Sequence, residues 1–261
     1  MSLDQPNDFV KHQTTTRDAF LAGRITLSQP AKGFRAGSDS VLLGAAVPKG
    51  TRNLLDLGAG VGTAALVALA LERATQAVLV ERHLQTLELA HQNIVANGFE
   101  GRAEALNVDI LDRHGARTAA GLESDHFDTV IANPPYFDAG QGTLSNETSR
   151  ADARHMAEDS LETWVRCAAG CGTADGTFIM VYPARGLAPL LAAMVPRFGA
   201  ITILPISPRP GEIATRVMVR GQKGSRSPLT LLASRALHGE TGRDYDPAFE
   251  AIFRGQASLD W

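Results

Sequence analysis

Three closely spaced glycines between an apolar strand and a helix restrict the fold of this chain more than any other sequence feature. Residues 53–57 are mostly apolar and read as a strand, Gly58, Gly60 and Gly62 follow at alternate positions, and a helix is expected over residues 63–73. Glycine lets the backbone of the turn approach a ligand closely, and Gly62 lets the helix pack against its strand. This order of elements is typical of α/β folds in which a nucleotide-like ligand meets the start of the helix.

The spacing of the glycines narrows the class of ligand. It is Gly-x-Gly-x-Gly, whereas dinucleotide-binding folds carry Gly-x-Gly-x-x-Gly. A dinucleotide has a pyrophosphate that sits on the helix N-terminus, and S-adenosylmethionine has none. The pattern therefore favours S-adenosylmethionine.

Strands and helices alternate along most of the chain. This alternation predicts a parallel sheet with helices on both faces. Residues 201–204 and 215–219 form two further β runs joined by a proline-rich turn, which predicts an antiparallel hairpin that closes the sheet. The expected fold is therefore α/β, with a mostly parallel sheet of seven strands. Its parallel strands are expected at residues 53–57, 76–80, 103–108, 127–132 and 176–182, and its helices at residues 63–73, 83–97 and 158–170.

Acidic side chains lie at the ends of three expected parallel strands: Asp56, Glu81 and Asp109. In Rossmann-like folds a carboxylate in the position of Glu81 accepts hydrogen bonds from the ribose hydroxyls, although a solvated glutamate at a helix start explains this residue alone equally well. Asp109 is suited to the amino group of an adenine. Because the carboxyl ends of parallel strands share one edge of the sheet, the three carboxylates are expected at one ligand site.

The strand expected at residues 127–132 runs into the tetrapeptide Asn133-Pro134-Pro135-Tyr136. Its prolines fix φ and lack amide donors, so the carbonyls of Asn133 and Pro134 remain as acceptors beside the Asn133 side chain. Such a corner can accept both hydrogens of a planar NH₂ group, and the Tyr136 ring can stack on a flat substrate. The alternative is that the prolines only end the strand and Tyr136 packs on the core. The acidic strand ends that precede the tetrapeptide favour the catalytic interpretation.

These motifs together resemble those of a known enzyme family. The segment Asp56-Leu57-Gly58-Ala59-Gly60-Val61-Gly62, with Glu81, Asp109 and the Asn-Pro-Pro-Tyr tetrapeptide, is similar to the successive motifs of class I S-adenosylmethionine-dependent methyltransferases that methylate amino groups. The segment from Gln29 to Leu43, which contains Gly33-Phe34-Arg35-Ala36-Gly37-Ser38-Asp39-Ser40, is similar to the N-terminal signature of bacterial tRNA (adenine-N6) methyltransferases, which modify the adenine 3′ of a valine tRNA anticodon. The resemblance spans roughly residues 20–219.

The resemblance implies a Rossmann-like class I methyltransferase fold, S-adenosyl-L-methionine as cofactor, and a tRNA adenine next to the anticodon as substrate. It implies direct methyl transfer to the exocyclic nitrogen, with Asn133 and the Pro134 carbonyl accepting the N–H groups and Tyr136 stacking the base. Arg35 or neighbouring amides are expected at the cofactor carboxylate. The catalytic residues implied are Asn133, Pro134, Pro135 and Tyr136, and the cofactor-binding residues are Arg35, Gly37, Asp39, Ser40, Asp56, Gly58, Gly60, Gly62, Glu81 and Asp109.

Basic residues cluster in parts of the chain that suit RNA. The net charge of −3 argues against a broadly cationic nucleic-acid binder, so local clusters matter more. Residues 204–238 contain six basic residues and one acidic residue, which suits phosphate contact, although a solubilising strand edge is an equally good explanation. Residues 138–155 are polar and are expected to form a mobile loop beside the substrate. The candidate RNA-binding residues are Phe137, Arg150, Arg154, Arg209 and Arg216.

Composition agrees with one globular domain. Of 261 residues, 44% are hydrophobic and 20% charged, which is enough for one large core. Residues 1–18 are expected to be disordered or flexible, and residues 19–261 to form a single methyltransferase domain whose first part, about residues 19–50, covers the cofactor. The absence of a long apolar run or signal peptide favours a cytoplasmic location. Cys167 and Cys171 lack a second ligand pair, so no metal is expected, and the sequence leaves the oligomeric state open.

Other functions stay open beside tRNA methylation. A protein glutamine-N5 methyltransferase uses the same tetrapeptide, because an amide NH₂ poses the same geometric problem. Such enzymes typically carry a helical domain before the catalytic fold, whereas this chain has only about fifty residues there. A DNA adenine methyltransferase would carry a target-recognition domain. A non-catalytic RNA-binding module of the same fold would not need the complete set of cofactor and catalytic motifs.

Overall fold

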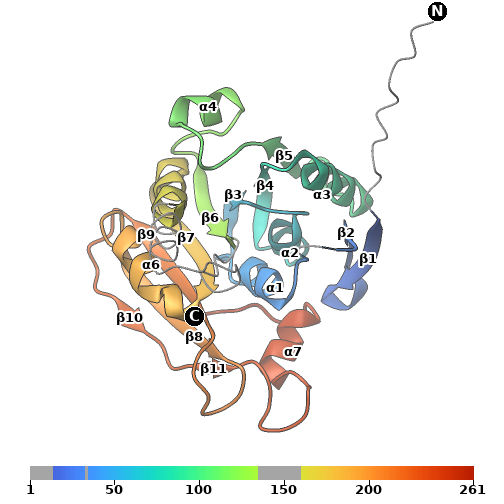
Figure 1. Cartoon of the computed structure of the whole chain (residues 1–261), viewed down its shortest axis with the longest axis vertical. Helices are drawn as coiled ribbons and strands as arrows, with labels where there is room; N and C mark the ends of the chain where they lie inside the picture. Colours follow the sequence, from blue (N-terminus) through green and yellow to red (C-terminus); the bar gives the residue numbers. More distant parts are fainter. Residues whose placement is uncertain (1–13, 33–34, 135–159) are drawn as a thin grey trace, which may run out of the picture.

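The computed structural model describes residues 14–32, 35–134 and 160–261. A mixed sheet crosses this part of the molecule, with strand order β10-β8-β9-β7-β6-β3-β4-β5 and with β11 also paired to β8 (Figure 1). All neighbouring strands are parallel except β9, which runs antiparallel to both β7 and β8. The strands are β3 (Thr51–Leu57), β4 (Ala74–Glu81), β5 (Ala103–Asn107), β6 (Phe127–Ala132), β7 (Gly172–Pro183), β8 (Phe198–Ser207), β9 (Arg216–Lys223), β10 (Thr230–Leu231) and β11 (Arg235–Ala236).

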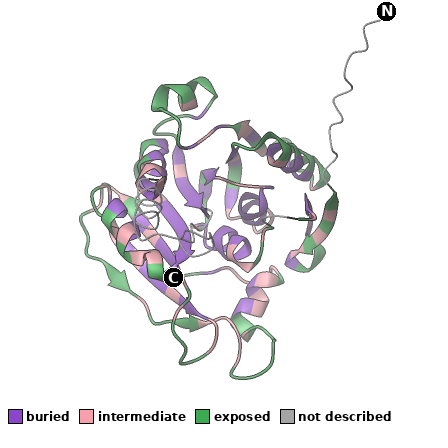
Figure 2. Ribbon diagram, in the orientation of Figure 1, coloured by how far each residue is buried: buried purple, intermediate pink, exposed green. Residues whose placement is uncertain are grey.

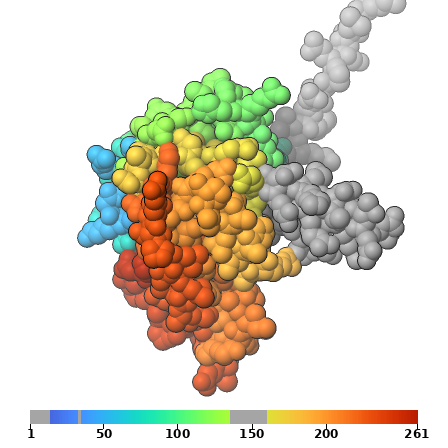
Figure 3. Space-filling view, turned by 90° about the vertical axis from the view of Figure 1, so that its left-hand side faces the viewer, coloured from blue at the N-terminus to red at the C-terminus, as the bar shows by residue number. Residues whose placement is uncertain are grey.

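The expected fold class is confirmed. Strands β3 to β9 are the seven strands that the sequence predicts, and β8 and β9 form the antiparallel closing hairpin. Strands β10 and β11 extend the sheet beyond the prediction. They have two residues each and pair only with the outer edge of β8, so they are too short to show an alternating pattern. The chain from β8 onward, orange to red in Figure 3, forms the lower part of the face shown there.

Helices cover both faces of the sheet. Leu54 packs toward α1, α2, α3 and α7, whereas Leu55 and Leu57 pack toward α6 and the helical residues 160–171. The central strands of the sheet are largely buried (Figure 2), which favours apolar residues such as Leu54, Leu55 and Leu57 of β3, whereas α4 has no buried residue. The helices are α1 (Ser38–Ala45), α2 (Thr63–Ala70), α3 (Leu84–Ala96), α4 (His114–Ala119), α6 (Leu187–Met194) and α7 (Pro247–Phe253), with 3-10 turns η1 (Leu21–Gly23) and η2 (Ala184–Gly186).

Helix α2 ends three residues before the predicted position. The amide of Glu72 donates to the carbonyl of Leu69 at 3.1 Å and that of Arg73 to Ala68 at 2.9 Å. These two bonds form a Schellman motif, and Glu72 adopts the left-handed conformation that the motif requires, with φ of 54°. Glycine usually occupies that position, so the sequence carried no signal for the end of the helix. The early end lets β4 begin at Ala74.

An N-terminal hairpin, β1 (Thr15–Phe20) and β2 (Ile25–Pro30), forms a separate two-stranded sheet beside α3. Asn93 of α3 and Asn97, which directly follows that helix, bond to β2 as a neighbouring strand would. Asn93 accepts from the amide of Ser28 at 2.7 Å and donates to its carbonyl at 3.1 Å, and Asn97 does the same with Thr26 at 2.9 and 3.0 Å. The hairpin is thereby fastened to α3 along β2.

The expectation of flexibility over residues 1–18 is wrong for residues 15–18, which belong to β1. Their side chains alternate between exposed and half-buried positions, and the backbone pairs with β2 along its length. Residues 1–13 lie outside the described part of the chain. Among the described residues, no helix is long and apolar enough to cross a membrane.

Candidate active site

A cavity of about 360 Å³ lies at the carboxyl ends of β3, β4, β5 and β6. This is the edge at which open α/β sheets bind their ligands. The hairpin strand β2, the first turn of α1 and the helical residues 160–171 complete its walls. The lining residues are Gln29, Pro30, Lys32, Ala36, Ser40, Asp56, Gly58, Ala59, Gly60, Val61, Ala64, Val80, Glu81, Arg82, His83, Thr86, Val108, Asp109, Ile110, Leu111, Asn133, Ser160 and Trp164.

The glycine-rich turn after β3 forms one wall of the cavity. Gly58 and Gly60 have φ of 66° and 58°, a region in which residues with a Cβ are strained. A Cβ on Gly58 would lie 2.4 Å from the ring of Trp164, whereas a Cβ on Gly60 would meet no atom within 4 Å. Gly62, with φ of 91°, precedes α2 and would bring a Cβ to 2.6 Å from Leu79 of β4. Gly58 and Gly60 thus shape the cavity, and Gly62 lets α2 pack on the sheet.

Asp56 lies beneath this turn and is 2% exposed. Its carboxylate accepts a hydrogen bond at 3.1 Å from the amide of Ala65, in the first turn of α2. Burial raises the pKa of Asp56 from 3.8 to about 7, the Ala65 amide opposes that rise, and the negative charge of Glu81 adds to it. Asp56 therefore bonds to the N-terminal turn of α2 from the preceding strand, β3, and titrates near neutral pH.

Glu81 ends β4 and is 8% exposed. One carboxylate oxygen accepts from the amide of Gly60 at 3.1 Å, and the other accepts from the amide of His83 at 2.8 Å. These bonds fix the carboxylate against the glycine-rich turn. Each carboxylate oxygen carries a second lone pair, so Glu81 retains acceptor capacity for hydroxyl groups of a ligand.

Asp109 follows β5 on the adjacent wall. One oxygen accepts from the amide of Leu111 at 2.9 Å, and the other lies 3.7 Å from the Arg82 guanidinium. That ion pair is partly exposed and long, so it is weak and a ligand can replace it. Val108 and Ile110 line the cavity beside Asp109, which combines an apolar wall with a carboxylate acceptor.

Asn133 follows β6 and also lines the cavity. Its side-chain nitrogen donates to the hydroxyl of Ser40 in α1 at 3.2 Å. Pro134, the next residue, is buried. Pro135, Tyr136, Phe137, Arg150 and Arg154, together with the loop expected at residues 138–155, lie outside the described residues.

Comparison with known proteins identifies the family. The family model described as methyltransferase small domain matches residues 33–163. The chain belongs to this methyltransferase family. A tRNA1(Val) (adenine(37)-N6)-methyltransferase of Escherichia coli O157:H7 (strain EC4115 / EHEC) is 30% identical over 171 residues, which cover 64% of this chain and 66% of the relative, so the match spans just under two thirds of that relative's length. A relative of the same name from Escherichia coli O6:K15:H31 (strain 536 / UPEC) is 28% identical over 78% of this chain and 88% of its own.

The comparison with solved structures agrees with this family assignment. A predicted O-methyltransferase, protein Atu636 from Agrobacterium tumefaciens, is 32% identical, with a TM-score of 0.71, and the alignment covers 85% of this chain and 98% of that one. The expected family and the expected cofactor, S-adenosyl-L-methionine, are thereby confirmed for this methyltransferase.

The cavity residues fit that cofactor. The open space above Gly60 lets a ligand lie against the backbone, and Glu81 offers acceptors for a ribose at the same turn. The apolar wall with Asp109 suits an adenine ring and its amino group. Within the described ranges, no group of three or more His, Cys, Asp or Glu side chains is arranged to hold a metal ion.

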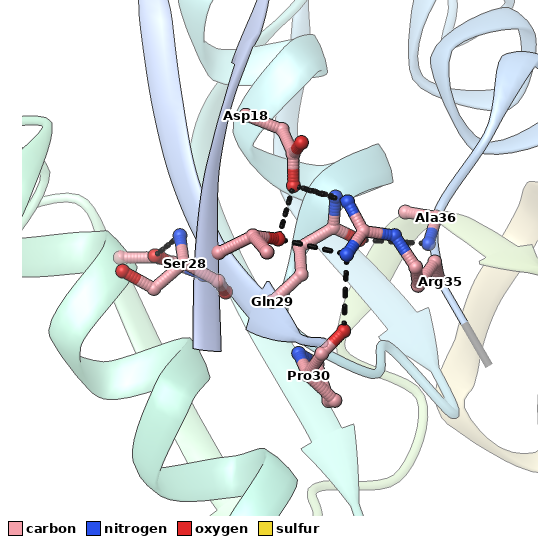
Figure 4. Close-up of polar contacts among 8 residues, drawn as sticks. Asp18, Ser28, Gln29, Pro30, Arg35 and Ala36 are labelled. Atoms are coloured by element: carbon pink, nitrogen blue, oxygen red, sulfur yellow. Dashed lines mark hydrogen bonds and ion pairs between the residues drawn. The ribbon is translucent and has the colours of Figure 1, made fainter. Parts of the chain in front are cut away.

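Arg35 of this methyltransferase has a different environment from the one expected. Its guanidinium donates to the Thr16 hydroxyl and to Asp18, both at 2.7 Å, and to the Pro30 carbonyl at 3.2 Å (Figure 4). Asp18 also accepts from Gln29 at 3.0 Å. Arg35 therefore ties the segment before α1 to the hairpin and is not among the cavity-lining residues, because the hairpin offers its donors a carboxylate, a hydroxyl and a carbonyl.

Four more expected site residues lie outside the cavity lining. Asp39 pairs with Arg216, whose Nε lies 2.9 Å from its carboxylate, so these two residues join α1 to β9. Arg209 donates to the carbonyls of Gly239 at 2.8 Å and Gly242 at 2.5 Å and thereby holds the loop before α7. Gly37 precedes α1 with extended backbone and does not line the cavity.

Several lining residues were missed by the motif-based prediction. Gln29 and Lys32 belong to the segment that carries the N-terminal signature, but neither residue type by itself indicates a role. Ser160 and Trp164 lie one helical turn apart, so a polar residue and an aromatic residue at i and i+4 were the available signal. Among the described residues, the buried Ser160 hydroxyl has no hydrogen-bond partner.

Proposed function

We propose that this methyltransferase transfers a methyl group from S-adenosyl-L-methionine to N6 of an adenine in tRNA, next to the anticodon. The curated relatives carry names for this reaction on a valine tRNA. The observation that carries the proposal is the position of Asn133, which places a carboxamide at the wall of the cofactor cavity and at the end of β6, directly beside β3. A cytoplasmic location belongs to the same proposal, because tRNA is the substrate.

Three charged residues would hold the cofactor. Glu81 accepts hydrogen bonds from the ribose hydroxyls while it stays bonded to the glycine-rich turn, and Asp109 accepts from the adenine amino group beside the apolar wall. Lys32 lines the cavity next to Gln29 and Pro30. Its ammonium group would bind the carboxylate of the cofactor, in place of Arg35. The bound cofactor supplies a methyl group on a positively charged sulfur.

Asn133 and Pro134 activate the acceptor nitrogen. The lone pair of the adenine amino group is delocalised into the ring, so the nitrogen is a weak nucleophile until it becomes tetrahedral. The Asn133 side-chain oxygen and the Pro134 carbonyl accept the two N–H hydrogens, which favours that geometry and stabilises the positive charge that develops on nitrogen. The reaction would require no protein nucleophile: a nitrogen–carbon bond would form as the carbon–sulfur bond of the cofactor breaks, sulfur would leave as a neutral thioether, and the methylated nitrogen would release one proton to water.

The test is tRNA methylation by the wild type and by Asn133→Ala. We expect 6-methyladenosine in the tRNA fraction by nucleoside mass spectrometry, and a fall in turnover on the order of 10²-fold in the variant, because the lost acceptor acts mainly in the transition state. Cofactor affinity, measured by calorimetry, is expected to stay unchanged. Asn53→Ala is the matched control, since Asn53 lies in β3 away from the carboxyl edge of the sheet.

Three outcomes would contradict the proposal. Full activity of Asn133→Ala would remove the assigned catalytic role. Methylated glutamine in a protein fraction, with no methylated adenine in tRNA, would instead indicate the protein glutamine-N5 methyltransferase. A protein that does not bind the cofactor at all would be a non-catalytic module.

A further inference from the structure

The first turn of α1 lies between two strand ends of the sheet. Ser40 accepts the hydrogen bond from Asn133 at the end of β6, and it is 6% exposed. Its neighbour Asp39 pairs with Arg216, the first residue of β9, at 2.9 Å. The sequence resemblance assigned both Asp39 and Ser40 to the cofactor. In the structure Ser40 lines the cavity and its hydroxyl accepts from Asn133, whereas Asp39 lies outside the cavity lining and pairs with Arg216.

We propose that this turn is a positioning device for the catalytic carboxamide: Ser40 holds the Asn133 side chain in its reactive orientation, and the Asp39–Arg216 ion pair holds Ser40 in place. This inference rests on the proposed catalytic role of Asn133. It adds a function for α1 that is separate from cofactor binding.

The Asn133 carboxamide needs a hydrogen-bond partner that fixes its orientation. The final torsion of asparagine is broad and roughly two-fold, so the nitrogen and the oxygen can exchange places at little cost. Methyl transfer requires the oxygen, because the nitrogen has only donors and cannot accept the N–H groups of the substrate. The nitrogen and oxygen diverge from one carbon, so a bond that holds the nitrogen on Ser40 also fixes the direction of the oxygen.

Helix α1 is seated firmly enough to serve this purpose. At Gly44 it approaches α2 so closely that a Cβ would lie 2.3 Å from the carbonyl oxygen of Ala64. At its C-terminal end the Ala45 carbonyl accepts from the amide of Leu259 at 3.0 Å. Its N-terminus has no side-chain cap, since Gly37 precedes it, and the Asp39–Arg216 pair supplies the anchor at that end.

The kinetic test compares Ser40→Ala with Ser38→Ala, the same substitution two residues earlier on the same helix. We expect Ser40→Ala to lower kcat about tenfold, the factor that corresponds to one hydrogen bond, with unchanged cofactor affinity by calorimetry. Ser40→Thr, which keeps the hydroxyl, restores most of kcat, and Ser38→Ala retains wild-type kcat. Thermal unfolding confirms that each variant is folded.

A double-mutant cycle separates positioning from independent action. If Ser40 acts through Asn133, then Ser40→Ala costs nothing further when it is combined with Asn133→Ala. A full tenfold loss in that background overturns the proposal. The same holds if Ser40→Ala weakens cofactor binding while kcat is retained, or if it behaves like Ser38→Ala.

A second measurement does not depend on the substrate. The side-chain amide signals of Asn133 in a ¹⁵N–¹H spectrum are assigned by their loss in Asn133→Ala. We expect Ser40→Ala, but not Ser38→Ala, to shift one proton of that pair. Unchanged signals overturn the positioning role even if tRNA is not the substrate. A shifted signal in a protein without activity on tRNA supports the positioning of Asn133 by Ser40 and refutes only the proposed function.

Discussion

Replacement of Asp56 by asparagine is expected to remove a large part of the dependence of stability on pH. Asp56 is buried under the glycine-rich turn, and its pKa rises from 3.8 to about 7 on folding. The asparagine introduced by Asp56→Asn keeps an oxygen that can accept from the Ala65 amide but cannot ionise. The substitution therefore isolates the cost of a buried charge at this position.

The sign and size follow from proton linkage. Between pH 4 and pH 7 the folded protein keeps the Asp56 proton that the unfolded chain releases, so the free energy of unfolding falls as pH rises through this window and is level above it. A shift of about three pH units, at about 1.4 kcal/mol for each, corresponds to about 4 kcal/mol. The wild type should lose roughly that amount from this group between pH 4 and pH 7.5, and Asp56→Asn should not.

Urea unfolding at a series of pH values measures this difference. Trp164 packs against Gly58 and provides a fluorescence probe close to the site. The quantity compared is the change in unfolding free energy with pH in the two proteins, which cancels any constant effect of the substitution. Parallel pH profiles for wild type and variant would refute the argument, as would a carboxyl ¹³C titration that places the Asp56 pKa near 4.

Two further predictions concern the cavity and the hairpin. Glu81→Gln should weaken S-adenosyl-L-methionine binding by about tenfold or more in calorimetry, because a neutral amide cannot accept from Gly60, His83 and the ribose together; Glu88→Gln, on the exposed face of α3, is the matched control, and equal affinities would move the ribose contact elsewhere. Asn93→Ala should lower the free energy of unfolding by about 2–4 kcal/mol, because it leaves the backbone groups of Ser28 and the Val61 carbonyl without their partner. An effect no larger than that of the exposed Gln92→Ala would contradict this.

The sequence predicts the sheet well because its signals are local and repeated. The central strands β3 and β6 are largely buried on both faces, so they contain apolar runs, and their carboxyl ends are followed by glycines or by a polar residue. The predicted end of α2 was wrong because Glu72 adopts a left-handed backbone conformation, and glycine is the residue that usually marks this conformation in a sequence. Strands β10 and β11 escape prediction since their two residues each depend on the edge of β8 for their conformation.

The bonding partner of a side chain depends on how the elements dock, which local sequence patterns do not show. This difference explains which expected site residues reach the cavity. Asp56, Gly58, Gly60, Glu81, Asp109 and Asn133 lie at strand ends, where topology alone brings them to one edge. Arg35 and Asp39 lie off the sheet, so their neighbours depend on how the hairpin and α1 dock. That docking is decided by residues with no motif of their own: Asn93 and Asn97 hold β2, and Gly44 sets the distance between α1 and α2. A charged residue beside a cofactor motif therefore indicates the region of the site, while its role is fixed by the nearest partner that the docking provides.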